Sequence, residues 1–169
     1  MNKVPITRPG HERLYWQLQY LRRYARRQVA NDLADAREFG ITNRNLQWRT
    51  AREKQAWVES RIQDLTSKIA SCEVIISPLG RPGRVIFGSW VRIHNLQTGQ
   101  TDTFQMVGPY ESDILAGRLS IASPVGRLLL NRAEGDRVKV QTPNGIRDYQ
   151  VLAIFLPAPI RPGAYLSGN

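Results

Sequence analysis

Residues 48–72, WRTAREKQAWVESRIQDLTSKIASC, decide the fold of the N-terminal half. One set of positions in this stretch recurs at alternating steps of three and four residues, the spacing of a coiled-coil seam: Trp48, Ala51, Gln55, Val58, Ile62, Leu65, Ile69 and Cys72. An apolar stripe this narrow does not bury a helix in a large core, but a second helix can cover it. The stretch therefore predicts one arm of a helical hairpin.

The preceding stretch supplies the other arm. Its apolar residues also follow one helical face: Leu14, Leu18, Leu21, Ala25, Val29, Leu33 and Ala36. Gly40 offers a helix stop, and residues 41–45 form a short connection. Two helices joined by so few residues run antiparallel, so we expect a projecting hairpin about 45 Å long.

The sequence changes character after Ser77. Pro78, Gly80, Pro82 and Gly83 interrupt the helical pattern and indicate a linker. Beyond this linker, β-rich runs predict strands over four ranges: 85–93, 101–107, 138–140 and 149–155. Ser123 followed by Pro124 predicts the start of a short helix over 124–131.

These elements predict an α+β fold with three parts. Residues 1–77 form an antiparallel coiled-coil hairpin, residues 78–156 form a small β-sheet domain with a short helix, and residues 157–169 form a flexible tail rich in Pro and Gly.

Composition narrows the class of protein. The chain has 169 residues, with 24 Lys and Arg against 14 Asp and Glu, which gives a net charge of +10. No apolar run is long enough to span a membrane, and the N-terminus lacks the apolar core of a secretory signal, so we expect a cytoplasmic protein. The single cysteine, Cys72, excludes an internal disulfide framework and a multi-cysteine zinc site.

Part of the positive charge is concentrated on the first arm, in an arginine patch made of Arg22, Arg23, Arg26 and Arg27. Like charges four residues apart on a helix repel, and no acidic residue occurs between Arg13 and Asp32 to relieve them. Two interpretations stay open: a solvated helix face, or a surface that faces the phosphates of nascent RNA or of DNA. Tyr20 and Tyr24 are placed to add aromatic contacts to such a surface.

No catalytic or cofactor motif is present. The sequence has no nucleophile–base arrangement, no glycine-rich phosphate loop and no metal-ligand spacing, so we expect no catalytic residue, metal or cofactor. Trp48 on the seam and Trp57 beside it are expected to pack rather than to stack on nucleotides, and Cys72 is expected to be a small buried seam residue.

Several strings follow one another in the order and spacing of a known family. They are Pro5-Ile6-Thr7 with Gly10, Ala36-Arg37-Glu38 before Gly40, Ala51-Arg52-Glu53 before Gln55, Arg61-Ile62, Gly83-x-Val85-x-Phe87-Gly88, Val107-Gly108, Ser120-Ile121-x-Ser123-Pro124 with Gly126, Glu134-Gly135-Asp136, and Thr142-Pro143-x-Gly145. With these motifs the chain resembles the bacterial Gre transcript-cleavage factors over about residues 5–156.

The resemblance implies a fold and a partner. The C-terminal domain of such factors has an FKBP-like fold and binds bacterial RNA polymerase, with Ser123 and Pro124 matching a segment at the contact surface. The hairpin enters the secondary channel, where two acidic residues at its tip help to hold a second Mg²⁺ while the polymerase hydrolyses backtracked RNA. We expect this chain to act there as a monomer.

The tip is where this sequence departs from the family. Its residues are Ile41, Thr42, Asn43, Arg44 and Asn45, and no carboxylate occurs anywhere in 41–48. Ile41 and Arg44 occupy the positions where the family has its two acids. An alkyl chain cannot ligate Mg²⁺, and a guanidinium repels it. We therefore expect a factor that is not an enzyme and that regulates elongation or initiation without stimulating cleavage, as an inhibitor or a competitor of Gre factors.

Other interpretations remain open at this point. The chain could be an active cleavage factor that rescues backtracked polymerase through Glu38 or Asp35. Its second domain could be a peptidyl-prolyl isomerase, although fold alone does not carry function. The arginine patch could bind nucleic acid directly. Arg44 could approach the acidic centre of the polymerase, or could only keep the tip soluble.

Overall fold

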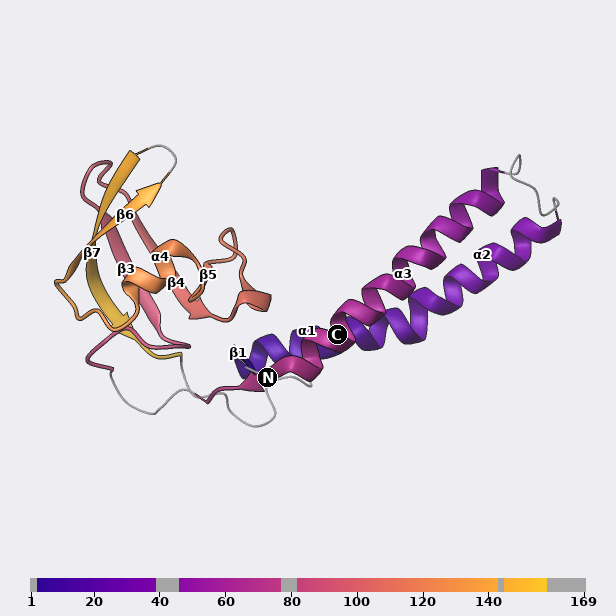
Figure 1. Cartoon of the computed structure of the whole chain (residues 1–169), viewed down its shortest axis with the longest axis horizontal. Coiled ribbons are helices and arrows are strands. Elements are labelled where there is room, and N and C mark those ends of the chain that lie inside the picture. Colours follow the sequence, from indigo (N-terminus) through magenta and orange to yellow (C-terminus); the bar gives the residue numbers. More distant parts are fainter. Residues whose placement is uncertain (1–2, 39–45, 77–81, 143–144, 158–169) are drawn as a thin grey trace, which may run out of the picture. The chain divides into compact units, whose positions relative to one another are not determined.

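The computed structural model describes residues 3–38, 46–76, 82–142 and 145–157 (Figure 1). The chain divides into two compact units. The first unit comprises Met1–Val4 and Arg8–Val74, and the second comprises Pro5–Thr7 and Ile75–Asn169. Among the described residues, no helix has both the length and the hydropathy that a membrane crossing requires.

The first unit is a helical hairpin. Its first arm consists of α1 (Arg8–Tyr20), a π-helical turn η1 (Leu21–Ala25) and α2 (Arg26–Glu38), and its second arm is α3 (Leu46–Ser71). Figure 1 shows α2 and α3 side by side. The residues buried between the arms are those of the two predicted stripes: Leu14, Leu18, Leu21, Val29, Leu33 and Ala36 from the first arm, and Ala51, Val58, Ile62 and Leu65 from α3. The predicted hairpin is confirmed.

The π-helical turn explains how the first arm keeps one face buried. Leu21, Ala25, Val29 and Leu33 are each four residues apart, so in a regular helix of 3.6 residues per turn they would drift around the axis. The backbone N–H of Arg26 instead donates to the carbonyl of Leu21, five residues earlier, which makes one wider turn. As a result Val29 and Leu33 remain 7% and 8% exposed.

The second predicted seam is one residue shorter than expected. Cys72 begins β2 (Cys72–Val74), which pairs with β1 (Val4–Ile6) in a two-stranded sheet, and its side chain is half-buried. The seam therefore loses its last predicted member, because the chain changes from helix to strand at that residue.

The second unit is built on a five-stranded sheet with the order β5-β4-β3-β7-β6. Its elements are β3 (Trp90–Asn95), β4 (Thr101–Val107), the short 3₁₀ helix η2 (Pro109–Glu111), β5 (Arg118–Ser120), α4 (Pro124–Leu129), β6 (Arg137–Thr142) and β7 (Gly145–Phe155). Neighbouring strands run antiparallel except β4 and β5, which are parallel. Helices in the first unit and a mixed sheet in the second confirm the predicted α+β class.

The core of this unit lies on one face of the sheet, beside α4. It contains Val85, Val91, Ile93, Met106, Leu119, Leu129, Val138, Val140, Val151 and Ile154. In β7 the inward residues Val151 and Ile154 are three apart rather than two. The pairing of β7 with β3 shifts register between Arg92 and Ile93, which leaves Leu152 outside the ladder and 44% exposed. The extra residue of this bulge lets Val151 and Ile154 both face the core.

The first predicted strand of this unit is shorter than expected. The run 85–93 reads as one strand, but only the part from Trp90 onward is in the sheet. Gly88 has a φ of 81°, and the Ser89 hydroxyl donates to the carbonyl of Ile86 at 2.7 Å. The segment before Trp90 therefore closes a turn, which β-rich composition alone does not predict.

Residues Pro5–Thr7 are anchored in the second unit through Glu111. The backbone N–H of Thr7 donates to Glu111 Oε1 at 2.8 Å, the Thr7 hydroxyl donates to Oε2, and the N–H of Gly108 donates to Oε1 at 3.2 Å. Glu111 is only 6% exposed. These bonds satisfy a buried carboxylate and explain why three residues that precede α1 belong to the second unit.

Candidate functional site

The predicted tip lies outside the described residues. This holds for Ile41, Thr42, Asn43, Arg44 and Asn45, since α2 ends at Glu38 and α3 begins at Leu46. The residues that border the tip are described. The Arg37 guanidinium lies over the ring of Trp48, 5.8 Å from its centroid, so Trp48 packs between the arms as expected.

An open groove between α2 and α3 lies next to the tip and contains two carboxylates. Its lining consists of Asp32, Asp35, Ala36, Leu46, Gln47, Thr50, Ala51 and Lys54. Asp32 accepts hydrogen bonds from Gln28 at 3.1 Å and from Lys54 at 3.2 Å, and these bonds lower the pKa of its carboxyl, the Gln28 bond most. Asp35 and Glu38 are exposed. Nowhere in the described parts of the chain do three His, Cys, Asp or Glu side chains come together as a metal site would require.

The donor set of the tip does not fit Mg²⁺. The expected tip has Ile41 and Arg44 where the resemblance implies two acids, and the described carboxylates next to it form no cluster of three. A hard divalent cation needs several oxygen ligands with negative charge among them. Residues 41–48 supply neutral amide and hydroxyl oxygens at most.

All four arginines of the predicted patch are exposed, but two of them have partners on the other arm. Arg26 makes a two-pronged ion pair across the hairpin, from Nε and Nη2 to the two carboxylate oxygens of Glu59 at 2.7 and 2.6 Å. Arg22 Nη2 donates to Thr66 Oγ1 at 3.2 Å. Arg23 and Arg27 are exposed. The patch therefore stays a prediction, and helical spacing within one arm did not show that Arg26 would meet a carboxylate on the other arm.

The Arg26–Glu59 pair has a testable pH signature. The hydrogen bonds from the Arg26 guanidinium lower the pKa of the Glu59 carboxyl, and burial opposes them. We expect a carboxyl-detected NMR titration to place the pKa of Glu59 below its ordinary value, and Arg26→Gln to raise it. Because the folded-state pKa is depressed, any contribution of the pair to stability is present above the unfolded-state pKa and is lost as the pH falls through the folded one.

The matched control for this titration is Arg23→Gln, which removes an exposed arginine three residues away on the same arm. A Glu59 pKa that responds equally to both substitutions would show that general charge, rather than the paired geometry, sets it.

Large aromatic side chains are exposed along one side of the hairpin. Trp16, Tyr20, Tyr24 and Trp57 are 67%, 61%, 66% and 62% exposed. Tyr20 is the last residue before the π-helical turn, and Tyr24 lies within the turn. Their rings stack, with centroids 5.8 Å apart and an interplanar angle of 30°. The expectation that Trp57 packs is wrong, because the residue beside a narrow seam points to solvent when no third helix covers it.

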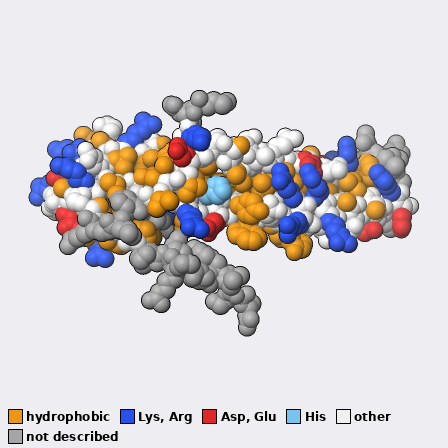
Figure 2. Space-filling view, turned by 90° about the horizontal axis from the view of Figure 1, so that it is seen from below, with side chains coloured by type: hydrophobic (Ala, Val, Ile, Leu, Met, Phe, Trp, Pro, Cys, Tyr) orange, Lys and Arg blue, Asp and Glu red, His pale blue; other side chains and the backbone are white. Residues whose placement is uncertain are grey.

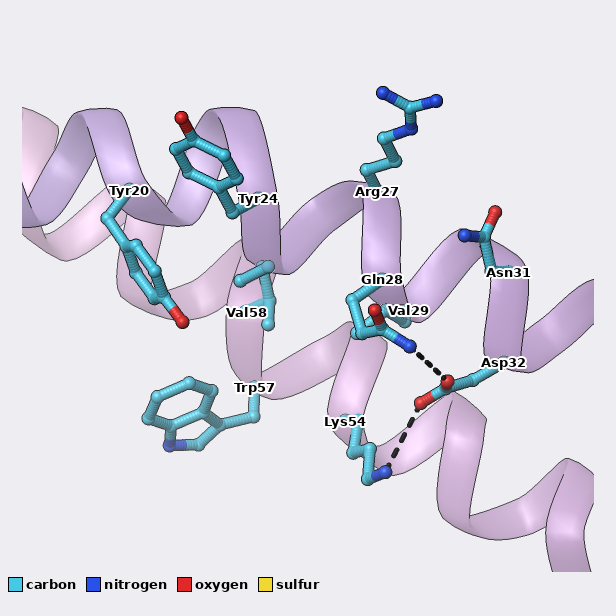
Figure 3. Close-up of a pocket in the computed structure, with 11 residues that line it drawn as sticks. Tyr20, Tyr24, Arg27, Gln28, Val29, Asn31, Asp32, Lys54, Trp57 and Val58 are labelled. Atoms are coloured by element: carbon cyan, nitrogen blue, oxygen red, sulfur yellow. Dashed lines mark hydrogen bonds and ion pairs between the residues drawn. The ribbon is translucent and has the colours of Figure 1, made fainter.

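These rings border two adjoining open grooves, which we call together the aromatic groove. The first has a volume of about 640 Å³ and is lined by Tyr20, Tyr24, Ala25, Arg27, Gln28, Val29, Asn31, Asp32, Lys54, Trp57 and Val58. The second has a volume of about 600 Å³ and is lined by Arg13, Trp16, Gln17, Tyr20, Leu21, Trp57, Arg61 and Leu65. Tyr20 and Trp57 line both. Figure 3 shows Tyr20 extending from the first arm toward α3, with Trp57 opposite it.

The predicted polymerase-contact residues of the second unit have a local structural role. Ser123 caps α4: its hydroxyl accepts from the N–H of Gly126 at 3.0 Å and donates to the carbonyl of Ser120 at 2.7 Å. Pro124, the first residue of the helix, is exposed. The sequence predicted this cap correctly, and it presents the ring of Pro124 at the surface.

Comparison with known proteins matches both halves of the chain. Residues 4–74 match the family model "Transcription elongation factor, N-terminal", and residues 80–155 match "Transcription elongation factor, GreA/GreB, C-term". A protein named transcription elongation factor GreA from Syntrophobacter fumaroxidans is 42% identical over 91% of this chain and 99% of its own length. One of the same name from Nitrosococcus oceani is 40% identical over 91% of this chain and 98% of its own length.

Among solved structures, one described as the transcription factor Gfh1 is 28% identical, covers 90% of this chain and 97% of that chain, and has a TM-score of 0.43. The matched family models follow the two units in order, and the identity to the GreA proteins extends over nearly their whole length. The chain belongs to the GreA/GreB family of transcription elongation factors.

Proposed function

We propose that the chain acts on bacterial RNA polymerase in the cytoplasm as a transcription elongation factor. The observation that carries this proposal is the match of both halves, in order, to the family that acts on this enzyme. In the proposed arrangement residues 78–156 dock on the polymerase, with Pro124 at the surface of α4, and residues 8–76 enter the secondary channel.

The first candidate activity is stimulation of transcript cleavage by the polymerase. It is favoured by relatives named GreA at about 40% identity, and for the same reason the expectation that the chain is not an enzyme is wrong. The carboxylates nearest the tip that could serve this activity are those of Asp35 and Glu38, which are exposed at the end of α2. They lie three residues apart, so they share one side of the helix.

A second candidate is favoured by a specific observation, the absence of any carboxylate from residues 41–48. A hairpin of this kind would occupy the secondary channel, compete there with other Gre factors and retune elongation or initiation while leaving backtracked RNA intact. Arg44 at the tip would then be drawn to the acidic centre of the polymerase.

One experiment separates these candidates. Backtracked elongation complexes of a bacterial polymerase are incubated with the full chain, and both retention on immobilised polymerase and shortening of the labelled RNA are measured. The first candidate predicts shortening that falls at least several-fold in the double variant Asp35→Asn, Glu38→Gln. A matched control is Glu12→Gln, which removes a carboxylate from α1, far along the arm from the tip.

The second candidate predicts retention without shortening, together with slower cleavage by an added GreA protein. A chain that is not retained by the polymerase at all would contradict the proposal that the polymerase is its partner.

A further inference from the structure

We propose that the aromatic groove binds single-stranded nucleic acid by stacking bases on Tyr20, Tyr24 and Trp57. This binding needs no polymerase, and so it goes beyond the function proposed above. The first argument is exposure. Each of these residues is more than 60% exposed. Burying one such ring removes roughly 150–250 Å² from water, so a cluster of them on one side of a two-helix hairpin indicates a surface that meets a ligand.

The second argument is the form of the surface. The floor of the groove is closed, since Leu21, Val29, Val58 and Leu65 are all at most 8% exposed and lie between the helices. The large exposed hydrophobic side chains beside this floor are aromatic, and both arms contribute them. A partner helix needs an apolar trough that receives its side chains, whereas a nucleic-acid base needs only a ring face.

The third argument is charge. The lining of the aromatic groove holds four cationic residues, Arg13, Arg27, Lys54 and Arg61, and a single acidic one, Asp32. Asp32 is already paired with Lys54, and Arg61 is paired at 2.8 Å with Asp64, which lies outside the lining, so Arg27 is the exposed cation that carries the argument. Figure 3 shows Arg27 on the same arm as Tyr24, extending away from the helices, and Figure 2 shows blue Lys and Arg side chains among orange hydrophobic ones along the hairpin. A positive rim beside exposed rings suits a chain that carries phosphates and bases together.

The partners of the four patch arginines bear on this placement. Arg22 and Arg26 are bonded to Thr66 and Glu59 on α3. Arg23 and Arg27 flank Tyr24 and Arg26 in the chain and are exposed. The cations that are free to meet phosphates are thus those next to the stacked tyrosines.

The test uses the full chain without polymerase. A labelled single-stranded oligoadenylate of about ten nucleotides is titrated as RNA and as DNA, with fluorescence anisotropy as the readout. Inorganic polyphosphate is a second probe, which offers the same charge without bases. We expect the double variant Tyr20→Ala, Tyr24→Ala to bind either oligoadenylate about ten-fold more weakly or worse and to bind polyphosphate unchanged.

Two variants serve as controls. The double variant Tyr20→Phe, Tyr24→Phe keeps both ring faces and should keep the affinity. Leu46→Ala removes an exposed large hydrophobic side chain of α3 that lines neither groove, and it should also leave binding intact. Arg27→Ala should reduce the dependence of affinity on salt by about 0.7 in the logarithmic slope. Circular dichroism of each variant verifies that the helices are retained.

Three results would overturn the proposal. The first is an unchanged affinity of the Tyr20→Ala, Tyr24→Ala variant for oligoadenylate. The second is a loss of affinity of this variant for polyphosphate as large as its loss for oligoadenylate. The third is binding of a duplex or of oligoglutamate by the unmodified chain as tightly as oligoadenylate. Because no polymerase is present, such a failure leaves polymerase binding untouched, so the two proposals fail separately.

Discussion

The double substitution Ile41→Asp, Arg44→Glu is expected to raise transcript cleavage on backtracked polymerase by about 100-fold over the unmodified chain. The change replaces an alkyl group and a cation by two carboxylates at the positions where the family carries its acids. Carboxylate oxygens are ligands that Mg²⁺ prefers, and removing the guanidinium of Arg44 removes a repulsive charge from the same place. The measurement is the rate of RNA shortening in elongation complexes, with the Mg²⁺ concentration varied.

The matched control for this gain is Ile41→Asn, Arg44→Gln, which makes both positions polar without adding negative charge. It should leave the rate near that of the unmodified chain. The contrary outcome is an acidic variant that polymerase retains to the same extent as the unmodified chain, with no increase in RNA shortening. In that case the rest of the scaffold does not present the tip to the catalytic centre. This result would contradict the assignment of the tip to residues 41–45.

The hairpin was predictable from the sequence because its energetics are local and periodic. Burial of one stripe per helix dictates the spacing of Leu14, Leu18, Leu33 and their partners on α3, and the structure buries the same residues. The π-helical turn was not predicted, although the run of four-residue steps from Leu21 to Leu33 is its signal in the sequence.

The features that the sequence did not show depend on contacts between distant residues. The pairing of Arg26 with Glu59 spans 33 positions, and that of Thr7 with Glu111 spans 104. Neither follows from the composition of one helix. The exposure of Trp57 was missed for a related reason: its position beside the seam is compatible with packing until the structure shows it 62% exposed.

The second unit shows the same division between local and distant information. Residues 101–107 have clear strand chemistry and predicted β4, and the runs 138–140 and 149–155 predicted parts of β6 and β7. The three-residue strand β5 (Arg118–Ser120) was not predicted, because it is too short for a pattern and pairs in parallel with β4. Its position nevertheless determines how closely α4 can approach the sheet.

This close approach gives Gly126→Ala a large expected effect on stability. A Cβ at position 126 would lie 2.0 Å from the carbonyl oxygen of Ser120, which is backbone and cannot rotate away. To relieve the clash, α4 would have to move off β5, and this would break the Ser123 cap and withdraw Leu129 from the core, where it is 0% exposed. We expect a loss of about 3 kcal/mol or more in the free energy of unfolding of the second unit.

Hydrogen exchange of backbone amides measures this loss within the second unit alone, for example at Met106, whose N–H donates to the carbonyl of Ser89. Gly83→Ala is the matched control. A Cβ there meets nothing within 4 Å, so the free energy should change by no more than about 0.5 kcal/mol. Protection that is unchanged in Gly126→Ala would contradict the tight packing of α4 on Ser120. If protection falls, weaker retention of the Gly126→Ala variant by polymerase reflects a displaced α4. The exposed proline ring is tested as a contact by Pro124→Ala instead, because that substitution leaves the Ser123 hydroxyl in place.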